Sequence, residues 1–289
     1  MTNGEPAPSR AAVRSIGRHG FHNIAYLDWG DPAAAEIIFC VHGLSRNSHD
    51  FDPLARVLAA RRRVICPDLA GRGRSDWLED PSDYHLLQYN LDLTVLAARV
   101  GAESFDWIGT SLGGLMGIAL AGIPNSPIRR LVINDVAPEI PVQALRRLSL
   151  YLGQDRLFPN LEALEAHLRE SLAPFGPMTD ADWRRMAETS STATKQGYRL
   201  ACDPSIAQNF SRYWLLIHAN LWRYWDRIRC PVLILRGTAS DFLTPFLLER
   251  MLRRLPHAEV VEFEGVGHAP TLNAPVQIYP VVEWLNADA

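Results

Sequence analysis

The stretch "WIGTSLGG", residues 107–114, places a serine between two glycines, where an apolar run gives way to a small-residue pattern. The run "FDWI" predicts a strand before the serine, and "LGGLMGIALAG" predicts a helix after it. So tight a turn requires glycine two positions on either side of Ser111, because larger side chains would collide. The turn would expose the Ser111 hydroxyl at a helix N-terminus, where the helix dipole favours an anionic oxygen. Ser111 is therefore a candidate nucleophile, although a serine that only caps a helix would fit the same pattern.

Strand-like runs continue on both sides of this turn and alternate with longer helical patterns. They read "EIIFCV" (36–41), "RVICPD" (63–68), "FDWIG" (105–109), "RRLVIND" (129–135), "PVLILRG" (231–237) and "EVVEFEG" (259–265). Several are apolar on both faces, as is typical of central strands in a sheet covered on both sides. The alternation predicts an α/β fold with a mostly parallel, doubly wound sheet. The segment "FHNIAYLDWG" (21–30) is expected at its antiparallel edge.

Residues 137–228 break this alternation. Prolines punctuate the segment, and the stretches between them read as helices with no convincing strand. The segment is too long to be a simple crossover between two strands. We therefore expect an α/β core made of residues 1–136 and 229–289, with an inserted all-helical cap over residues 137–228.

Composition and charge exclude several classes of protein. The 289 residues are 47% hydrophobic and 21% charged, which is ordinary for a globular protein, and the net charge of −3 gives no basic excess for a nucleic-acid partner. No apolar stretch reaches the roughly 18 residues of a membrane span, and the N-terminus lacks the apolar core of a signal peptide. The four cysteines match neither a zinc site nor a redox motif. These features predict a cytoplasmic protein with reduced thiols and no metal, membrane or nucleic-acid partner.

A nucleophilic serine needs a base, and the base needs an acid that orients it. His268, in "EGVGHAP", follows the last expected strand in a glycine-flanked loop, at the same sheet edge as Ser111. For the acid we favour Asp241, in "PVLILRGTASDFLTP", because the order serine, aspartate, histidine suits this topology. Asp135, in "VINDVAP", also follows a strand and is the alternative acid. Asp241 could instead cap the helix that begins near residue 244.

An oxyanion that forms at the serine needs two preorganised N–H donors. The amide of Leu112, directly after the nucleophile, is one candidate. The second is the amide of Leu44, in the segment His42-Gly43-Leu44-Ser45 that follows a strand, because Gly43 allows the backbone to turn sharply there. We interpret His42 as a structural hydrogen-bonding residue and not as a base.

Taken together and in order, "VHGLS", "DLAGRGRSD", "GTSLGG", "RGTASD" and "GVGHAP" resemble the α/β-hydrolase superfamily, and in particular its cap-bearing serine hydrolases. The segment "DLAGRGRSD" (68–76) looks like the D-x-x-G-x-G-x-S loop of these enzymes, which suggests a bracing role for Asp68, Gly71, Gly73 and Ser75. The resemblance implies a Ser111–Asp241–His268 triad, an acyl-enzyme and no cofactor.

Departures from related families narrow the reaction. The resemblance makes dehalogenases and epoxide hydrolases poor matches, because they use an aspartate where this chain has Ser111. Hydrolases that cleave C–C bonds often carry tryptophan after the histidine, whereas Ala269 follows His268 here, and Leu112 departs from the proline iminopeptidases. We expect an esterase or lactonase for small to medium, largely apolar acyl substrates. C–C hydrolysis of vinylogous diketones is the alternative, acyl transfer uses the same intermediate, and a non-catalytic small-molecule receptor is the reading from another class.

Aromatic residues recur at helical spacing near the end of the expected cap. Packing of the cap against the core explains this stripe best, and contact with substrate is the alternative for its candidate binding residues Trp214, His218 and Trp222. The arginines of the cap are interpreted as solvated helix faces, with carboxylate recognition by one of them as the lesser alternative; they are Arg146, Arg147, Arg184 and Arg185. The sequence does not predict an oligomeric state.

Overall fold

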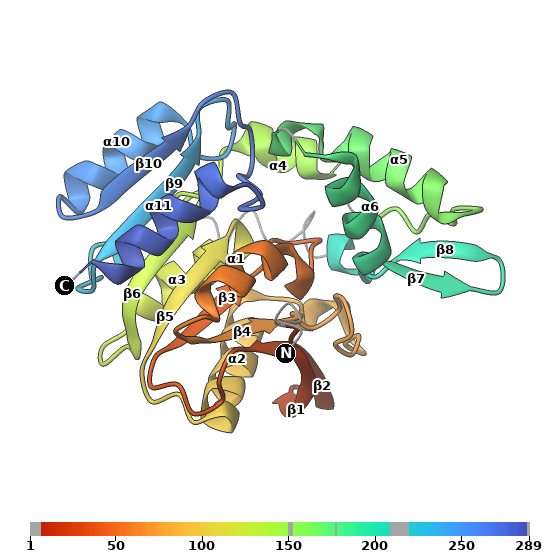
Figure 1. The fold of residues 1–289 in the computed structure, drawn as a ribbon, viewed down its shortest axis with the longest axis horizontal. Coiled ribbons are helices and arrows are strands. Elements are labelled where there is room, and N and C mark those ends of the chain that lie inside the picture. Colours follow the sequence, from red (N-terminus) through yellow and green to blue (C-terminus); the bar gives the residue numbers. More distant parts are fainter. Residues whose placement is uncertain (1–6, 150–152, 177, 209–219, 288–289) are drawn as a thin grey trace, which may run out of the picture.

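The computed structural model describes residues 7–149, 153–176, 178–208 and 220–287. Its centre is an eight-stranded sheet in the order β1-β2-β4-β3-β5-β6-β9-β10 (Figure 1). The pairs β1–β2 and β2–β4 are antiparallel and the others are parallel, which confirms the mostly parallel, doubly wound sheet. Strand β1, at one edge, is the strand of this sheet that the sequence pattern did not predict. The strands are β1 (Ser9–Gly17), β2 (Gly20–Trp29), β3 (Ile37–Val41), β4 (Arg63–Pro67), β5 (Phe105–Thr110), β6 (Ile128–Asn134), β9 (Val232–Gly237) and β10 (Glu259–Phe263).

Two apolar clusters cover the two faces of the sheet. In β3, Phe39 belongs to one cluster and Cys40 to the other, because successive side chains of a strand point to opposite faces. Helices α2, α3 and α10 complete the first cluster, and α1 and α11 complete the second. Their bounds are α1 (Asp52–Leu58), α2 (Leu86–Val100), α3 (Leu112–Ala121), α10 (Pro245–Arg254) and α11 (Pro275–Asn286). With both faces covered, the carboxyl edge of the parallel strands is the place left for a site.

The described residues of 142–200, in the segment between β6 and β9, lie beyond that edge at the upper right of Figure 1, whereas residues 222–225 of the same segment pack against α3. Its described residues add no strand to the main sheet, and we propose to treat residues 137–228 as an inserted unit. A small apolar cluster of its own, which includes Leu164, Trp183 and Met186, holds α5 against α6. The helices of the insertion are α4 (Val142–Ser149), α5 (Leu161–Ser171), α6 (Asp180–Thr189) and α9 (Trp222–Trp225).

The expectation that the insertion is entirely helical is wrong. Two short strands, β7 (Ser191–Thr194) and β8 (Gly197–Leu200), form an antiparallel hairpin in it. The sequence "STATKQGYRL" carries threonine and tyrosine, which favour strands, and Gly197 takes a φ of 135° that other residues rarely adopt. These strands were not predicted because each has only four residues, about one turn of the surrounding helical pattern, which is too few to show an alternation. Of the helix expected near residues 205–225, the part at 209–219 lies outside the described residues.

Backbone hydrogen bonds fasten the end of this hairpin to the core. Gly73 donates to the carbonyl of Ala201, and Asp203 donates to the carbonyl of Gly71, both at 2.8 Å. The Tyr84 hydroxyl also donates to Oδ2 of Asp203 at 2.6 Å. The loop at residues 68–76 therefore joins the core to the insertion.

No helix within the described ranges is both long and apolar enough to cross a bilayer.

Candidate active site

Ser111 occupies the turn between β5 and α3 in a strained backbone conformation, with φ 52° and ψ −110°. Such a conformation costs on the order of 1–3 kcal/mol in a residue other than glycine. A Cβ on Gly109 would lie 2.2 Å from the carbonyl oxygen of Gly113, and a Cβ on Gly113 would lie 2.1 Å from that of Val41. Both glycines are therefore required, one by the turn itself and the other by close packing against β3.

His268 reaches Ser111 from the loop after β10. Its Nε2 lies 3.0 Å from the Ser111 Oγ, so a neutral imidazole can accept the proton of the hydroxyl. The ring is only 6% exposed and stacks on Phe242, with a centroid separation of 3.7 Å. Stacking and burial fix the orientation of the ring. A general base needs this, because its nitrogen must stay within hydrogen-bond distance of the serine oxygen.

The acid that contacts His268 is Asp135, and the choice of Asp241 is wrong. The Nδ1–H of His268 donates to Oδ2 of Asp135 at 2.8 Å, since a carboxylate can only accept. Asp135 is fully buried. It also accepts hydrogen bonds from the Ser240 hydroxyl at 2.5 Å and from the Gly237 amide at 3.1 Å. These donors hold the carboxylate in one position beneath the imidazole.

Asp241 lies farther out, on the surface between the core and the insertion. Its carboxylate accepts two hydrogen bonds from Arg147 of α4, at 2.7 and 2.8 Å, and its side chain is 43% exposed. Partial burial alone would raise the pKa of Asp241, but the hydrogen bonds and ion pair with Arg147 hold that pKa below its ordinary value. Asp241 is not the helix cap either, because α10 is capped by the side chain of Thr244.

The physical reason for this error lies in the distance from the strand end. Asp135 is the first residue after β6, so the strand itself directs its side chain to the carboxyl edge. Asp241 comes several residues after Gly237, the last residue of β9, and the intervening loop carries it away. The residue of this loop whose side chain donates to Asp135 is Ser240 and not Asp241. The immediate succession of strand and aspartate in "VIND" was the signal that favoured Asp135.

The two expected oxyanion donors border Ser111. Leu44 lines the pocket above the serine, and Leu112 is the first residue of α3. Among the described residues, neither amide has a hydrogen-bond acceptor. A Cβ on Gly43 would lie 3.6 Å from the Cβ of Ser111, so the loop passes directly beside the nucleophile. Both amides are therefore free to bind an oxygen at the serine, and their role as an oxyanion hole stays a proposal.

His42 supports this loop from below. Its Nδ1–H donates to the carbonyl of Gly43 at 2.7 Å, and its Nε2 accepts from the amide of Leu69 at 2.9 Å. Complete burial is the main reason that the pKa of His42 falls to about 3, so the ring stays neutral. This confirms His42 as a structural hydrogen-bonding residue.

The bracing role expected for residues 68–76 is confirmed by their contacts. The Asp68 carboxylate accepts from the amides of Ser48 and Arg74, at 2.8 and 2.9 Å. Ser75 donates to the carbonyl of Asp68 at 2.5 Å and accepts from the amide of Ala25. Burial raises the pKa of Asp68, and the amides that it accepts from partly offset this.

Arg72 is a residue of this loop that the sequence analysis missed. Its side chain is fully buried, and its Nε donates to the carbonyl of Leu44 at 2.7 Å. Its Nη1 donates to the carbonyl of Ala70 and to the Tyr89 hydroxyl, both at 2.7 Å. Arg72 therefore holds the carbonyl side of the residue whose amide faces the pocket. Its position between two glycines gave no sign of such burial.

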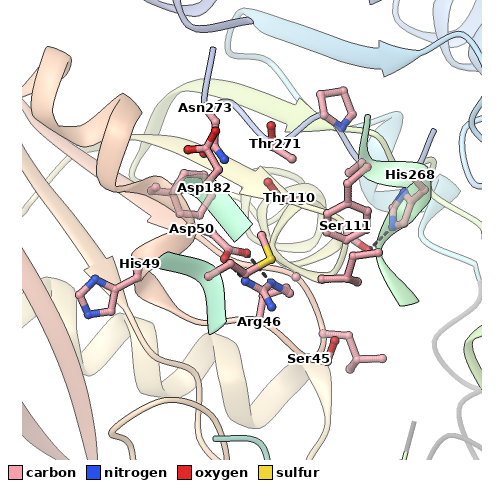
Figure 2. A pocket seen from close by; sticks show the side chains of 18 of the residues that line it. Ser45, Arg46, His49, Asp50, Thr110, Ser111, Asp182, His268, Thr271 and Asn273 are labelled. Atoms are coloured by element: carbon pink, nitrogen blue, oxygen red, sulfur yellow. Dashed lines mark hydrogen bonds and ion pairs between the residues drawn. The ribbon is translucent and has the colours of Figure 1, made fainter. Parts of the chain in front are cut away.

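The pocket above Ser111 has one face from the core and one from the insertion. Its space, open mouth included, is about 860 Å³. The insertion contributes apolar side chains, among them Leu148, Leu172 and Met186. Figure 2 shows Arg46, Asp50 and Asp182 toward one side of this pocket and Ser111 with His268 toward the other. The pocket thus combines apolar side chains of the insertion with charged residues at one end, which come from the core and from α6, and an expectation of largely apolar substrates did not include this charge.

Of the three candidate binding residues of the cap, the structure describes only Trp222. Trp222 is buried away from the pocket lining: its Nε1 donates to Glu139 at 2.5 Å, and Arg250 lies over its ring at 4.1 Å. Its role as a substrate contact is therefore wrong, and packing explains it. Trp214 and His218 lie outside the described residues. Arg185 is the one arginine of the expected cap set that lines this pocket among the described residues.

Within the described ranges, no group of histidine, cysteine, aspartate and glutamate side chains is arranged to hold a metal ion. The four cysteines are free thiols.

Comparison with known proteins identifies relatives of this chain. The model of the alpha/beta hydrolase family matches residues 38–280. A 3-hydroxybutyrate-oligomer hydrolase from Cupriavidus necator is 41% identical over 281 residues, which covers 94% of this chain and 96% of that protein. An esterase from Mycobacterium tuberculosis is 27% identical, over 97% of this chain and 92% of its own.

A solved structure agrees with these relatives. The crystal structure of an alpha/beta hydrolase from Novosphingobium aromaticivorans superimposes with a TM-score of 0.87. It is 34% identical to this chain and covers 98% of it, with 99% of its own chain matched. The fold is therefore similar to that of a known hydrolase over nearly the whole chain.

Proposed function

This chain belongs to the alpha/beta hydrolase family, and we propose that it hydrolyses short oligoesters of 3-hydroxybutyrate, or of a closely similar hydroxy acid, through an acyl-enzyme on Ser111. The observation that carries the proposal is the chain of contacts Ser111–His268–Asp135, with separations of 3.0 and 2.8 Å, at the floor of the pocket. Serine, histidine and aspartate in this arrangement are the machinery of acyl transfer to water.

The geometry supports the following steps. The Nε2 of His268 takes the proton of Ser111 as its Oγ attacks the ester carbonyl carbon. Asp135 keeps the imidazole in the correct tautomer and stabilises its positive charge. The amides of Leu44 and Leu112 bind the oxyanion of the tetrahedral intermediate, each contributing on the order of 3 kcal/mol to its stabilisation. The imidazolium then protonates the departing alkoxide, the C–O bond breaks, and the alcohol leaves.

Water completes the cycle. His268 takes a proton from the water molecule, whose oxygen attacks the acyl-enzyme carbonyl, and the proton is returned to Ser111 as the acid product departs. Both half-reactions use only the Ser111–His268–Asp135 chain and the two amides, and no cofactor enters these steps.

The pocket supports a hydroxy-acid oligoester better than a simple fatty ester. Each unit of such an oligomer carries a methyl group, which suits the apolar side chains of Leu172 and Met186. Each unit also carries polar oxygen atoms, and the negatively charged free acid end suits the guanidinium of Arg46, which lines one end of the pocket. The similarity to a 3-hydroxybutyrate-oligomer hydrolase over nearly the whole chain supports the same choice.

The test compares the wild-type enzyme with Ser111→Ala. We expect the wild type to release 3-hydroxybutyrate from its dimer and trimer, as measured by chromatography of the products. Ser111→Ala should lose at least about 10⁴-fold in kcat while keeping its far-ultraviolet circular dichroism, because removal of a triad nucleophile abolishes the covalent route. A phosphonate ester should label Ser111 and nothing else.

Ser82→Ala is the matched control, because Ser82 is an exposed serine far along the chain from the elbow. It should behave as the wild type in every assay. Turnover of a ring-fission dienoate in preference to both oligoesters and p-nitrophenyl esters would contradict ester hydrolysis and favour the C–C hydrolase alternative. Unchanged kinetics of Ser111→Ala would contradict the nucleophile.

A further inference from the structure

Arg46 is a buried cation immediately beside the nucleophile. It is only 5% exposed and lines the same pocket as Ser111. The point that a Gly43 Cβ would occupy lies 3.6 Å from the Ser111 Cβ and 3.9 Å from the Arg46 Cγ, so one glycine separates the two side chains. None of the steps proposed for ester hydrolysis uses this guanidinium.

The guanidinium is held rigidly but is only partly occupied. Its Nε donates to Oδ2 of Asp50 at 3.0 Å, and its Nη2 donates to Oδ1 of the same carboxylate at 2.6 Å. A guanidinium has five N–H groups, so this fork uses two of them. Among the described residues, Nη1 has no acceptor. The side of the guanidinium that includes Nη1 is therefore preorganised to bind a second planar group with two acceptor oxygens.

A second positive charge, that of Arg72, lies beside the loop, while the carboxylate of Asp50 offsets the charge of Arg46. Arg72, fully buried behind Leu44, bonds to carbonyls and to a phenol, and within the described ranges it forms no ion pair. Both Arg72 and Arg46 act on the pKa of His42, where their positive charges add to the main effect of burial. Of the described acids, Asp50 is the one that pairs with either guanidinium.

The wall formed by the insertion does not offer a similar group. Arg185 lines the pocket from α6, but it pairs with Asp182 of the same helix and its side chain is 36% exposed. A pair this exposed attracts a third charge weakly, because water screens it. Arg46 is the better-buried cation, and burial strengthens a charge-assisted hydrogen bond.

We propose that Arg46 binds the free carboxylate of the substrate, on the alcohol side of the scissile ester. This rests on the proposed function. In an oligomer of hydroxy acids, the free carboxylate always lies on the alcohol side of every ester bond. In the 3-hydroxybutyrate dimer, only the ester oxygen and two carbons separate this carboxylate from the scissile carbonyl, so it stays within the pocket that Ser111 and Arg46 both line.

The consequence is a direction of cleavage. A carboxylate fixed at Arg46 places the last ester bond of the oligomer over Ser111, so the enzyme releases the carboxyl-terminal unit as the leaving alcohol. The acyl-enzyme then carries the hydroxyl-terminal remainder, which extends along the apolar wall formed by the insertion. Arg46 is thereby a specificity-determining residue, since it contacts the substrate but not the reacting bond.

The experiment compares the free acid of the 3-hydroxybutyrate dimer with its methyl ester, which lacks only the charge. Arg46→Met keeps an unbranched stem about as long as the aliphatic part of arginine and removes the guanidinium donors. We expect the ratio of kcat/KM for acid over methyl ester to fall on the order of 10- to 100-fold in Arg46→Met, mainly through KM. Arg46→Lys should give an intermediate ratio, because an ammonium keeps the charge without the fork.

Two further variants keep this test decisive. The double variant Arg46→Met/Asp50→Asn removes both partners, so that no unpaired carboxylate is left buried, and it should show the same lowered ratio. Arg185→Met tests the rival guanidinium and should leave the ratio as in the wild type. A ratio that falls in Arg185→Met but not in Arg46→Met would overturn the proposal.

Inhibition separates this proposal from the proposed function. With p-nitrophenyl butyrate as the reporter substrate, 3-hydroxybutyrate should inhibit the wild type more strongly than its methyl ester does, and Arg46→Met should abolish that difference. This readout does not depend on oligoester turnover. Equal inhibition by acid and ester in the wild type would overturn the carboxylate site even if oligomers are hydrolysed. Failure of the wild type to cleave oligomers would instead overturn the proposed substrate.

Discussion

Two aspartates that follow neighbouring strands have opposite environments. Asp135, directly after β6, is fully buried and accepts hydrogen bonds from His268, Ser240 and the Gly237 amide. Asp241, after the adjacent strand β9, has a side chain that is 43% exposed and pairs with Arg147 of the insertion. The same residue type at neighbouring strand ends therefore serves either the imidazole or the attachment of the insertion. The end of a strand directs only the residue next to it, and the loop decides for the residues beyond.

The two carboxylates also differ in what their contacts are worth. A buried carboxylate with three donors is costly to disturb, because removal of its charge leaves those donors unsatisfied. An exposed ion pair contributes little, typically under about 1 kcal/mol. Replacing each aspartate in turn therefore tests the comparison directly.

The largest effect is expected from Asp135→Asn. The amide can donate to the Nδ1 of His268 and so favour the wrong tautomer, and kcat should fall by about 10⁴-fold with little change in KM. Initial rates on p-nitrophenyl butyrate measure this, with circular dichroism as the control for folding. A smaller loss in Asp135→Asn than in Asp241→Asn would reverse the assignment of the acid.

A smaller effect, a partial recovery of kcat, is expected when the carboxylate is moved from the end of β6 to the loop after β9. The Ser240 Oγ lies 2.5 Å from Oδ2 of Asp135, so a carboxylate at residue 240 can approach the same ring nitrogen. The double variant Asp135→Asn/Ser240→Asp should recover roughly 10- to 100-fold of the lost kcat, because a partly misplaced acid still orients the imidazole. Asp135→Asn/Ser240→Asn is the matched neutral control, and equal rates for the two double variants would show that residue 240 cannot supply the acid.

The smallest effect is expected from Asp241→Asn. Its kcat should stay within about threefold of the wild type, since Asp241 has no hydrogen bond to His268 among the described residues. The pKa of Asp241 is below its ordinary value, so the ion pair contributes stability above the ordinary aspartate pKa and loses it as pH falls through the lowered one. Urea unfolding should therefore show a difference under about 1 kcal/mol between wild type and variant at pH 7, vanishing in acid. A difference that persists unchanged in acid would contradict the ion pair as its source.

Much of this architecture follows from the sequence because it depends on local chemistry. Strand alternation predicts the sheet, and Gly109 and Gly113 around Ser111 predict the elbow that the backbone adopts. His268 is predictable because it is the histidine of the glycine-flanked loop after the last strand, at the sheet edge that carries Ser111, although it lies five residues beyond the end of β10. These features need only the next few residues or the order of the strands.

The parts that escaped prediction depend on contacts between distant segments. The acid was misassigned because the course of the loop after β9 depends on Arg147 and the insertion. The hairpin β7–β8 was missed because its strands are short and lie in a helical region. Arg46 lay outside the expected site since burial of its guanidinium becomes evident only when Asp50 and the pocket are in place.

The attachment of the insertion has a mechanical consequence. On one side, backbone hydrogen bonds join residues 201 and 203 to residues 71 and 73 of the core. On the other side, the pair of Arg147 with Asp241 is exposed, whereas the Gly267 amide donates to the carbonyl of Pro174 at 2.7 Å and the Asn47 side chain donates to that of Thr189 at 3.0 Å. Salt screens an exposed ion pair and hardly affects backbone hydrogen bonds. Among these contacts, raised ionic strength should therefore weaken the Arg147–Asp241 pair alone, while the backbone bonds at residues 71–73 and at Gly267 keep the insertion seated above the imidazole.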